Sequence, residues 1–159
     1  MSTTAIERPV DLHPAAVARL MRGGRKGELL LPMRPAPVMT PEVRAALVGG
    51  LRELGIEAEG LPDAELMALA FDEALEPTWR CPWGRGGDVL WAREQWAEVF
   101  GRFVVQGHVH PAQADGVAWR PAHLMPREAA RLVMRITHVG IAADAQGALC
   151  WDLDVEVGR

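Results

Sequence analysis

The sequence predicts an α+β fold, in which a small mixed β-barrel carries an early helix and an inserted helical hairpin. The first observation is a series of short apolar or alternating segments, expected as strands near residues 88–92, 101–109, 116–119, 130–140 and 147–157. The second is one helical segment near the start of the chain, and the third is a helical, acidic block at 40–78. Closure into a barrel would remove the unpaired edges that such short strands expose.

The first forty residues supply the outer elements of this fold. Residues 8–10 predict a short edge strand, because proline is tolerated at an edge. Residues 13–21 predict a helix with Pro14 in its first turn and Gly23-Gly24 at its end. Residues 28–34 predict another strand, which Pro32 restricts to an edge or a bulge.

The insertion at 40–78 is expected to form two helices outside the barrel. Thr40 is a suitable N-cap before Pro41, and Gly49-Gly50 predict a kink or break in the first helix. Pro62-Asp63 open the second helix. The block holds two basic and nine acidic residues, whereas the segments on either side, 1–39 and 79–140, each carry a net charge of +3.

The composition indicates one domain over residues 1–159, with 49% hydrophobic and 24% charged residues. No apolar run reaches the ~20 residues that span a bilayer, and no signal-peptide pattern opens the chain, so we expect a cytoplasmic protein without membrane contact. Cys81 and Cys150 are expected as free thiols, and we expect neither a metal nor another cofactor. His108 and His110, with Asp115 nearby, form only a weak metal pattern, and solvated surface histidines explain it better.

The segment from Cys81 to Trp96 is the most informative part of the chain. Its glycines predict a tight loop that leads through Asp88 into the apolar run 89–91. Three tryptophans lie within this segment beside arginine and glutamate side chains. Such a mixture suits a pocket for a planar polar ligand, although tryptophans at a strand are also common in protein cores.

Three motifs resemble a family of prophage-encoded proteins with the ASCH/PUA-like fold. The family pattern CPYGxPGDxLWVRETW is matched from Cys81 to Trp96, and WRPSxxMPRWASR is matched from Trp119 to Arg131, with Glu128 at a tryptophan position. A third pattern, GRKTxTRR followed by methionine and a basic-proline pair, aligns in part with residues 24–35. The resemblance covers roughly residues 5–140 apart from the insertion.

The resemblance implies a barrel with a cleft that binds RNA or a modified base. In amidohydrolase relatives, a lysine and a threonine act with a downstream glutamate, which implies Lys26 and Glu94 as the catalytic pair of this chain. The threonine positions are occupied by Gly27 and Leu29, which offer no hydroxyl. We therefore expect binding, with catalytic activity weak or absent.

The expected partner is RNA, another single-stranded nucleic acid or a nucleoside. Tryptophan faces would stack on bases, and guanidinium groups would donate to phosphates or base edges. The expected ligand-binding residues are Arg25, Trp83, Trp91, Arg93, Trp96, Trp119, Arg120, His123 and Arg127. The alternatives are a small hydrolase of a modified nucleoside or RNA, and a non-catalytic phage module that binds a protein through its acidic insertion.

Overall fold

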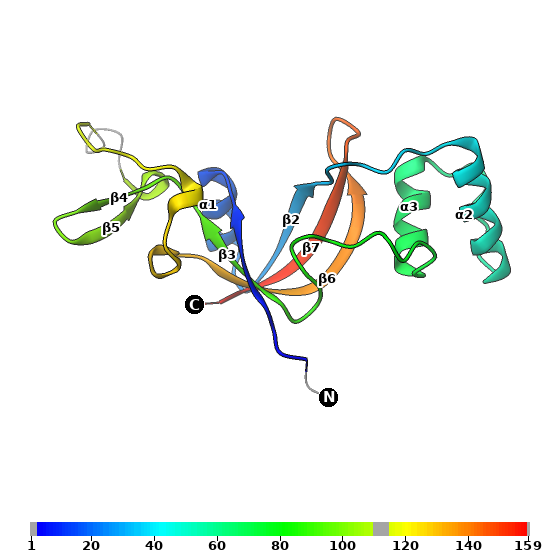
Figure 1. Cartoon of the computed structure of the whole chain (residues 1–159), viewed down its shortest axis with the longest axis horizontal. Coiled ribbons are helices and arrows are strands. Elements are labelled where there is room, and N and C mark those ends of the chain that lie inside the picture. The colour runs from blue at the N-terminus through cyan, green and yellow to red at the C-terminus, as the bar shows by residue number, and fades with distance from the viewer. Residues whose placement is uncertain (1–2, 110–114, 159) are drawn as a thin grey trace. The chain divides into compact units, whose positions relative to one another are not determined.

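The computed structural model describes residues 3–109 and 115–158, and the elements of this part of the chain are labelled in Figure 1. Five strands form one mixed sheet in the order β1-β3-β6-β7-β2, and two form a separate hairpin. The strands are β1 (Glu7–Asp11), β2 (Lys26–Pro32), β3 (Val89–Arg93), β4 (Trp96–Val99), β5 (Arg102–Val105), β6 (Val133–Ala143) and β7 (Leu149–Gly158). The α-helices are α1 (Pro14–Arg22), α2 (Pro41–Glu53) and α3 (Asp63–Asp72).

The sheet is mixed because β1 runs parallel to β3, whereas β3 runs antiparallel to β6. The order ends at β1 and β2, which contain Pro9 and Pro32, so the edge positions expected for both prolines are confirmed. Within the described residues, no closed barrel is formed. The α+β class is confirmed, and closure into a barrel stays a prediction.

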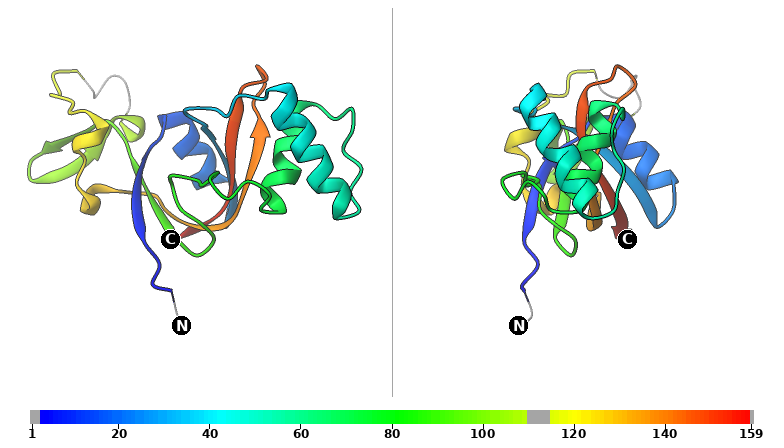
Figure 2. Two further views of the ribbon diagram at one scale, coloured as in Figure 1. Left: turned by 45° about the vertical axis from the view of Figure 1, so that its right-hand side comes forward. Right: turned by 90° about the vertical axis from the view of Figure 1, so that its right-hand side faces the viewer.

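The insertion contributes no strand to either sheet in the described chain, as expected. Helices α2 and α3 lie side by side in both views of Figure 2, and they share a core of Leu47, Leu51, Ala58, Leu66 and Ala70. The Thr40 hydroxyl accepts a hydrogen bond from the Val43 amide at 3.2 Å, which confirms the predicted N-cap.

The break expected at Gly49-Gly50 is wrong, because α2 continues from Pro41 to Glu53. A Cβ atom added to Gly50 would lie 3.2 Å from the Leu75 side chain. Gly50 therefore lets the Leu75 side chain, which follows α3, pack closely against α2. This packing stabilises α2 despite the low helix propensity of glycine.

Of two further expected strands, one is wrong in part and the other entirely. The segment 101–109 forms only β5, which pairs with β4 through a turn at Phe100-Gly101, and Gln106–His108 form a 3₁₀ turn, η1. The segment 116–119 is not a strand; Arg120 alone forms a β-bridge with Trp96. Sequence spacing missed β4 because only two residues separate it from β3.

The described chain divides into two compact units; three of the four boundaries fall within β2, β6 and β7, and the fourth lies between Pro82 and Trp83, before β3. We call Met1–Gly27, Trp83–Thr137 and Val155–Arg159 the basic unit, and Glu28–Pro82 and His138–Asp154 the acidic unit. No helix in the described residues is long and apolar enough to cross a membrane.

Candidate nucleic-acid interface

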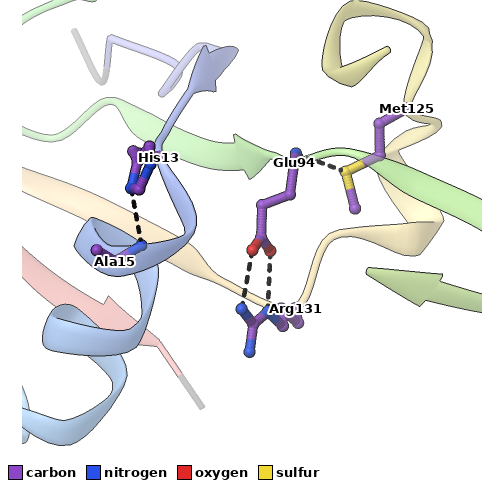
Figure 3. Close-up of polar contacts among 5 residues, drawn as sticks. All are labelled: His13, Ala15, Glu94, Met125 and Arg131. Atoms are coloured by element: carbon purple, nitrogen blue, oxygen red, sulfur yellow. Dashed lines mark hydrogen bonds and ion pairs between the residues drawn. The ribbon is translucent and has the colours of Figure 1, made fainter. Parts of the chain in front are cut away.

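Glu94, the expected catalytic carboxylate, is a buried partner of Arg131. It follows directly after β3 and is 1% exposed. Arg131 donates from Nε to Oε2 at 2.9 Å and from Nη2 to Oε1 at 2.8 Å, as Figure 3 shows. Both carboxylate oxygens are therefore engaged by one planar guanidinium, a geometry that is typical of a strong structural ion pair.

Gly107 covers this ion pair with main chain. An added Cβ atom at Gly107 would lie 3.3 Å from Glu94 Oε1, 3.2 Å from Arg131 Nη2 and 2.8 Å from Pro14 Cβ. The turn η1 can approach this closely only because residue 107 lacks a side chain. Beside the pair, the Glu94 amide donates to the Met125 sulfur at 3.2 Å (Figure 3).

His13 has a local structural role next to Pro14. Its Nδ1 atom accepts a hydrogen bond from the Ala15 amide at 3.2 Å, so the imidazole caps α1 (Figure 3). This contact satisfies one of the free amides at the start of the helix. The helix expected over residues 13–21 is confirmed, with His13 as its N-cap and Pro14 as its first residue.

Lys26, the other expected catalytic residue, is exposed at the first position of β2. No hydrogen bond or ion pair joins it to Glu94 in the described part of the chain, where Arg131 is the ion partner of Glu94. The adjacent Gly27 lies against the core: an added Cβ would lie only 2.4 Å from Leu20 Cδ2, and Leu20 is 3% exposed. A side chain at this position, where the resemblance places a threonine, would therefore require the buried Leu20 side chain to move.

Replacing Gly27 with threonine is expected to destabilise the protein by about 1–3 kcal/mol, since it overpacks the contact with Leu20. The measurement is the free energy of unfolding in urea at pH 7. Lys26→Thr is the matched control, because it places the same residue at an exposed position of the same strand. Equal stabilities for the two variants would contradict the assigned packing.

Trp96 lies at the centre of an aromatic and cationic group. The Arg120 guanidinium lies 4.9 Å from the centroid of the Trp96 ring, and the Phe103 ring meets that indole edge-on at 5.8 Å. Two backbone hydrogen bonds between Trp96 and Arg120, of 2.7 and 3.2 Å, hold this arrangement. Trp96 is 5% exposed, and its buried Nε1–H has no acceptor among the described residues.

Trp91 has a similar cationic neighbour. The Arg127 guanidinium lies 6.0 Å from its ring centroid and donates to both carboxylate oxygens of Glu7, at 3.1 and 3.4 Å. The hydrogen bond from Arg127 lowers the pKa of the exposed Glu7 carboxyl. Trp91 is half-buried.

The remaining expected ligand-binding residues all lie in the basic unit. Arg93 donates to Asp11 at 2.6 Å and to the carbonyl of the exposed His123 at 3.4 Å. Trp83 and Trp119 are half-buried. Arg25 is exposed and lines a concavity of about 450 Å³ together with Arg135, which the sequence analysis did not single out.

Asp88 is the organising residue of the glycine-rich loop, and sequence analysis gave it no role beyond leading into the strand. Its carboxylate accepts hydrogen bonds from the Ile6 amide at 3.0 Å, the Arg85 amide at 3.2 Å and Arg8 Nη1 at 2.9 Å. Burial alone would raise the pKa of Asp88, but these three hydrogen bonds outweigh it and lower the pKa. Gly84, at φ +123°, allows the close approach, since its Cβ would lie 2.6 Å from Asp88 Oδ2.

Charge separates sharply between the two units. The basic unit holds 13 basic and 8 acidic residues, a net charge of +5, whereas the acidic unit holds 4 basic and 13 acidic residues, a net of −9. The overall charge of −4 therefore conceals a unit that would attract a polyanion. Within residues 3–109 and 115–158, no group of three or more histidine, cysteine or acidic residues could hold a metal; His110 lies outside these ranges.

The pKa of Asp152, which lies near other acidic residues of the acidic unit, is raised. Burial raises the pKa of Asp152, and the negative charges of Glu28 and Asp154 raise it further. A side-chain hydrogen bond with Glu28 raises the pKa of Asp152 in the same direction. His138 opposes this rise.

Asp152→Asn is expected to raise the free energy of unfolding at pH 7 by at most about 1 kcal/mol, because partial exposure screens the repulsion that it removes. Because the pKa of Asp152 is raised, the folded state binds this proton more tightly than the unfolded state does. The protonated carboxyl therefore stabilises the fold at low pH, and this stabilisation is lost as the pH rises through the raised pKa. Urea unfolding at pH 7 and pH 4 checks this. The advantage of the variant should shrink at pH 4; an advantage independent of pH would contradict the assignment.

Comparison of the chain with protein-family models, with curated proteins and with solved structures gave no match.

Proposed function

We propose that the basic unit is a binding module for RNA or another single-stranded nucleic acid, of the ASCH/PUA-like kind, and that it acts without hydrolysing its ligand. The motifs that resemble the prophage family lie mostly in this unit, and the family and its barrel fold are part of the proposal. The net charge of +5 supports a polyanionic ligand.

The observation that carries the proposal is the stacking of guanidinium groups on indole rings within this positively charged unit. Arg120 lies over Trp96 and Arg127 lies over Trp91. Bases stack on aromatic rings and on guanidinium planes, and arginine also contacts phosphates. Arg120 has no ion-pair partner among the described residues, so its donors are open to a ligand.

The hydrolase alternative receives less support from the same residues. Glu94 is 1% exposed and has each oxygen bound to Arg131, so a substrate would have to displace or share this ion pair to reach the carboxylate. Gly27 supplies no hydroxyl, and a side chain in its place would require Leu20 to move. A nucleophile or an orienting group for water is therefore missing from the expected catalytic turn.

The proposal is tested by the fluorescence anisotropy of labelled 12-nucleotide single-stranded RNA and DNA and of a duplex of equal length, at 50 to 300 mM salt. We expect single strands to bind most tightly, with affinity that falls as salt rises because phosphate contacts release counterions. Arg120→Gln should weaken binding, whereas Arg52→Gln, whose arginine is paired with Glu57 and Glu59 in the acidic unit, should not. Absence of binding by the native protein at 50 mM salt would refute the proposal.

Hydrolysis is followed in parallel with acetylcytidine and with the same RNA. We expect no turnover by the native protein. If turnover is observed, the Lys26→Gln variant shows whether it depends on Lys26, since this exposed residue can be replaced without disturbing the core. Turnover that disappears in this variant would establish the hydrolase alternative.

A further inference from the structure

The tip of the β4–β5 hairpin carries a fully exposed phenylalanine in an unusual backbone conformation. Phe100 is 101% exposed, with φ +51°, and the next residue, Gly101, has φ +73°. Positive φ at both central residues is the signature of a type I′ turn, in which asparagine or glycine is normally favoured. A bulky residue at this position is a conformational outlier. Neither packing nor turn chemistry explains an aromatic side chain here.

The neighbours of Phe100 extend the aromatic and basic character along the hairpin. Phe103 is 47% exposed, and its ring contacts Trp96, on which Arg120 stacks. Arg102 directly follows the turn and is exposed, and no ion pair occupies it in the described chain. The one acidic residue of the hairpin is Glu98, which lies opposite Phe103 in the register.

We propose that Phe100 is a stacking residue for single-stranded nucleic acid, with Arg102 beside it as a phosphate contact. This inference rests on the function proposed above and adds the position of contact. The charge of the basic unit favours a polyanion, and an exposed aromatic ring is matched by the flat face of an unpaired base. In a duplex, the bases are already stacked on each other, so insertion of the ring would require unstacking.

The direct test places 2-aminopurine, whose fluorescence is quenched by stacking, within a 12-nucleotide single strand. Quenching and anisotropy are measured for the native protein and for Phe100→Ala, Phe100→Leu and Phe100→Tyr. We expect Phe100→Ala and Phe100→Leu to bind roughly fivefold to thirtyfold more weakly and to lose the quenching. Phe100→Tyr should retain both, because it keeps an aromatic ring. Val38→Ala, at a 78% exposed position of the acidic unit, is the control for loss of an exposed apolar group.

The outcomes separate this inference from the function on which it rests. If the native protein binds single strands and Phe100→Ala binds equally well with equal quenching, the stacking role is wrong and the proposed function stands. If Phe100→Leu binds as tightly as the native protein and quenches as strongly, the contact is apolar and does not involve stacking. That result would also overturn the inference. If the native protein binds no oligonucleotide but binds anionic vesicles through Phe100, both proposals fail.

Discussion

Glu94→Ala is expected to lower the free energy of unfolding by about 3–5 kcal/mol, the largest effect of any single substitution considered for this chain. The variant leaves the Arg131 guanidinium without its carboxylate partner next to the main chain of Gly107. The loss comes mainly from this uncompensated charge, since a buried ion pair itself contributes little net stability. Urea unfolding followed by tryptophan fluorescence measures the change.

The paired replacement Glu94→Leu with Arg131→Met provides the control. It removes both charges together, so most of the stability should return relative to Glu94→Ala. The exposed pair of Glu7 and Arg127 offers a second comparison, and Glu7→Gln should cost much less because water screens that contact. A double variant that is no more stable than Glu94→Ala would show that the ion pair is not what Glu94 contributes.

Asp88→Ala has the second largest expected effect, a loss of about 2–4 kcal/mol. The substitution leaves the Ile6 and Arg85 amides and the Arg8 guanidinium without their shared acceptor. The loop from Trp83 to Gly87 should loosen together with the start of β1. Hydrogen exchange of the Ile6 and Arg85 amides reports this directly, because both amides should lose protection in the variant.

The sign of the pH dependence follows from the lowered pKa of Asp88. A carboxyl whose pKa is lower in the folded state stabilises the protein above its ordinary pKa of about 3.9, and this stabilisation is lost as the pH falls through the lowered pKa. The stability difference between the native protein and Asp88→Ala should therefore be full at pH 7 and decrease below pH 4. A difference that grows on acidification would contradict the role of the charged form.

Much of the architecture follows from local sequence patterns. Period-two alternation predicted β7, and the helical spacing after Thr40 predicted the two helices of the insertion. Prolines identified both edge strands, because proline removes a donor that a central strand would need. These features depend on residues that are close together in the chain, so they can be predicted from the sequence.

The features that the sequence did not reveal depend on distant contacts. Glu94 and Arg131 are separated by 37 positions, and nothing local distinguishes their charges from solvated ones. Gly50 predicts a helix break from sequence alone, because its packing against the Leu75 side chain is visible only in the structure. For the candidate site, the sequence identified the aromatic and basic residues, but the stacking of Arg120 on Trp96 required a β-bridge between two segments.

The six tryptophans provide the most direct test of the central claim, that the basic unit binds single-stranded nucleic acid. Their indole N–H signals are resolved in a ¹⁵N-labelled protein and assigned with single tryptophan-to-phenylalanine variants. Four signals arise from the basic unit, at Trp83, Trp91, Trp96 and Trp119, and two from the acidic unit, at Trp79 and Trp151. Titration with a 12-nucleotide single-stranded RNA is predicted to shift the signals of Trp91 and Trp96 and leave those of Trp79 and Trp151 in place. Shifts confined to Trp79 and Trp151, or none at saturating RNA, would contradict the claim.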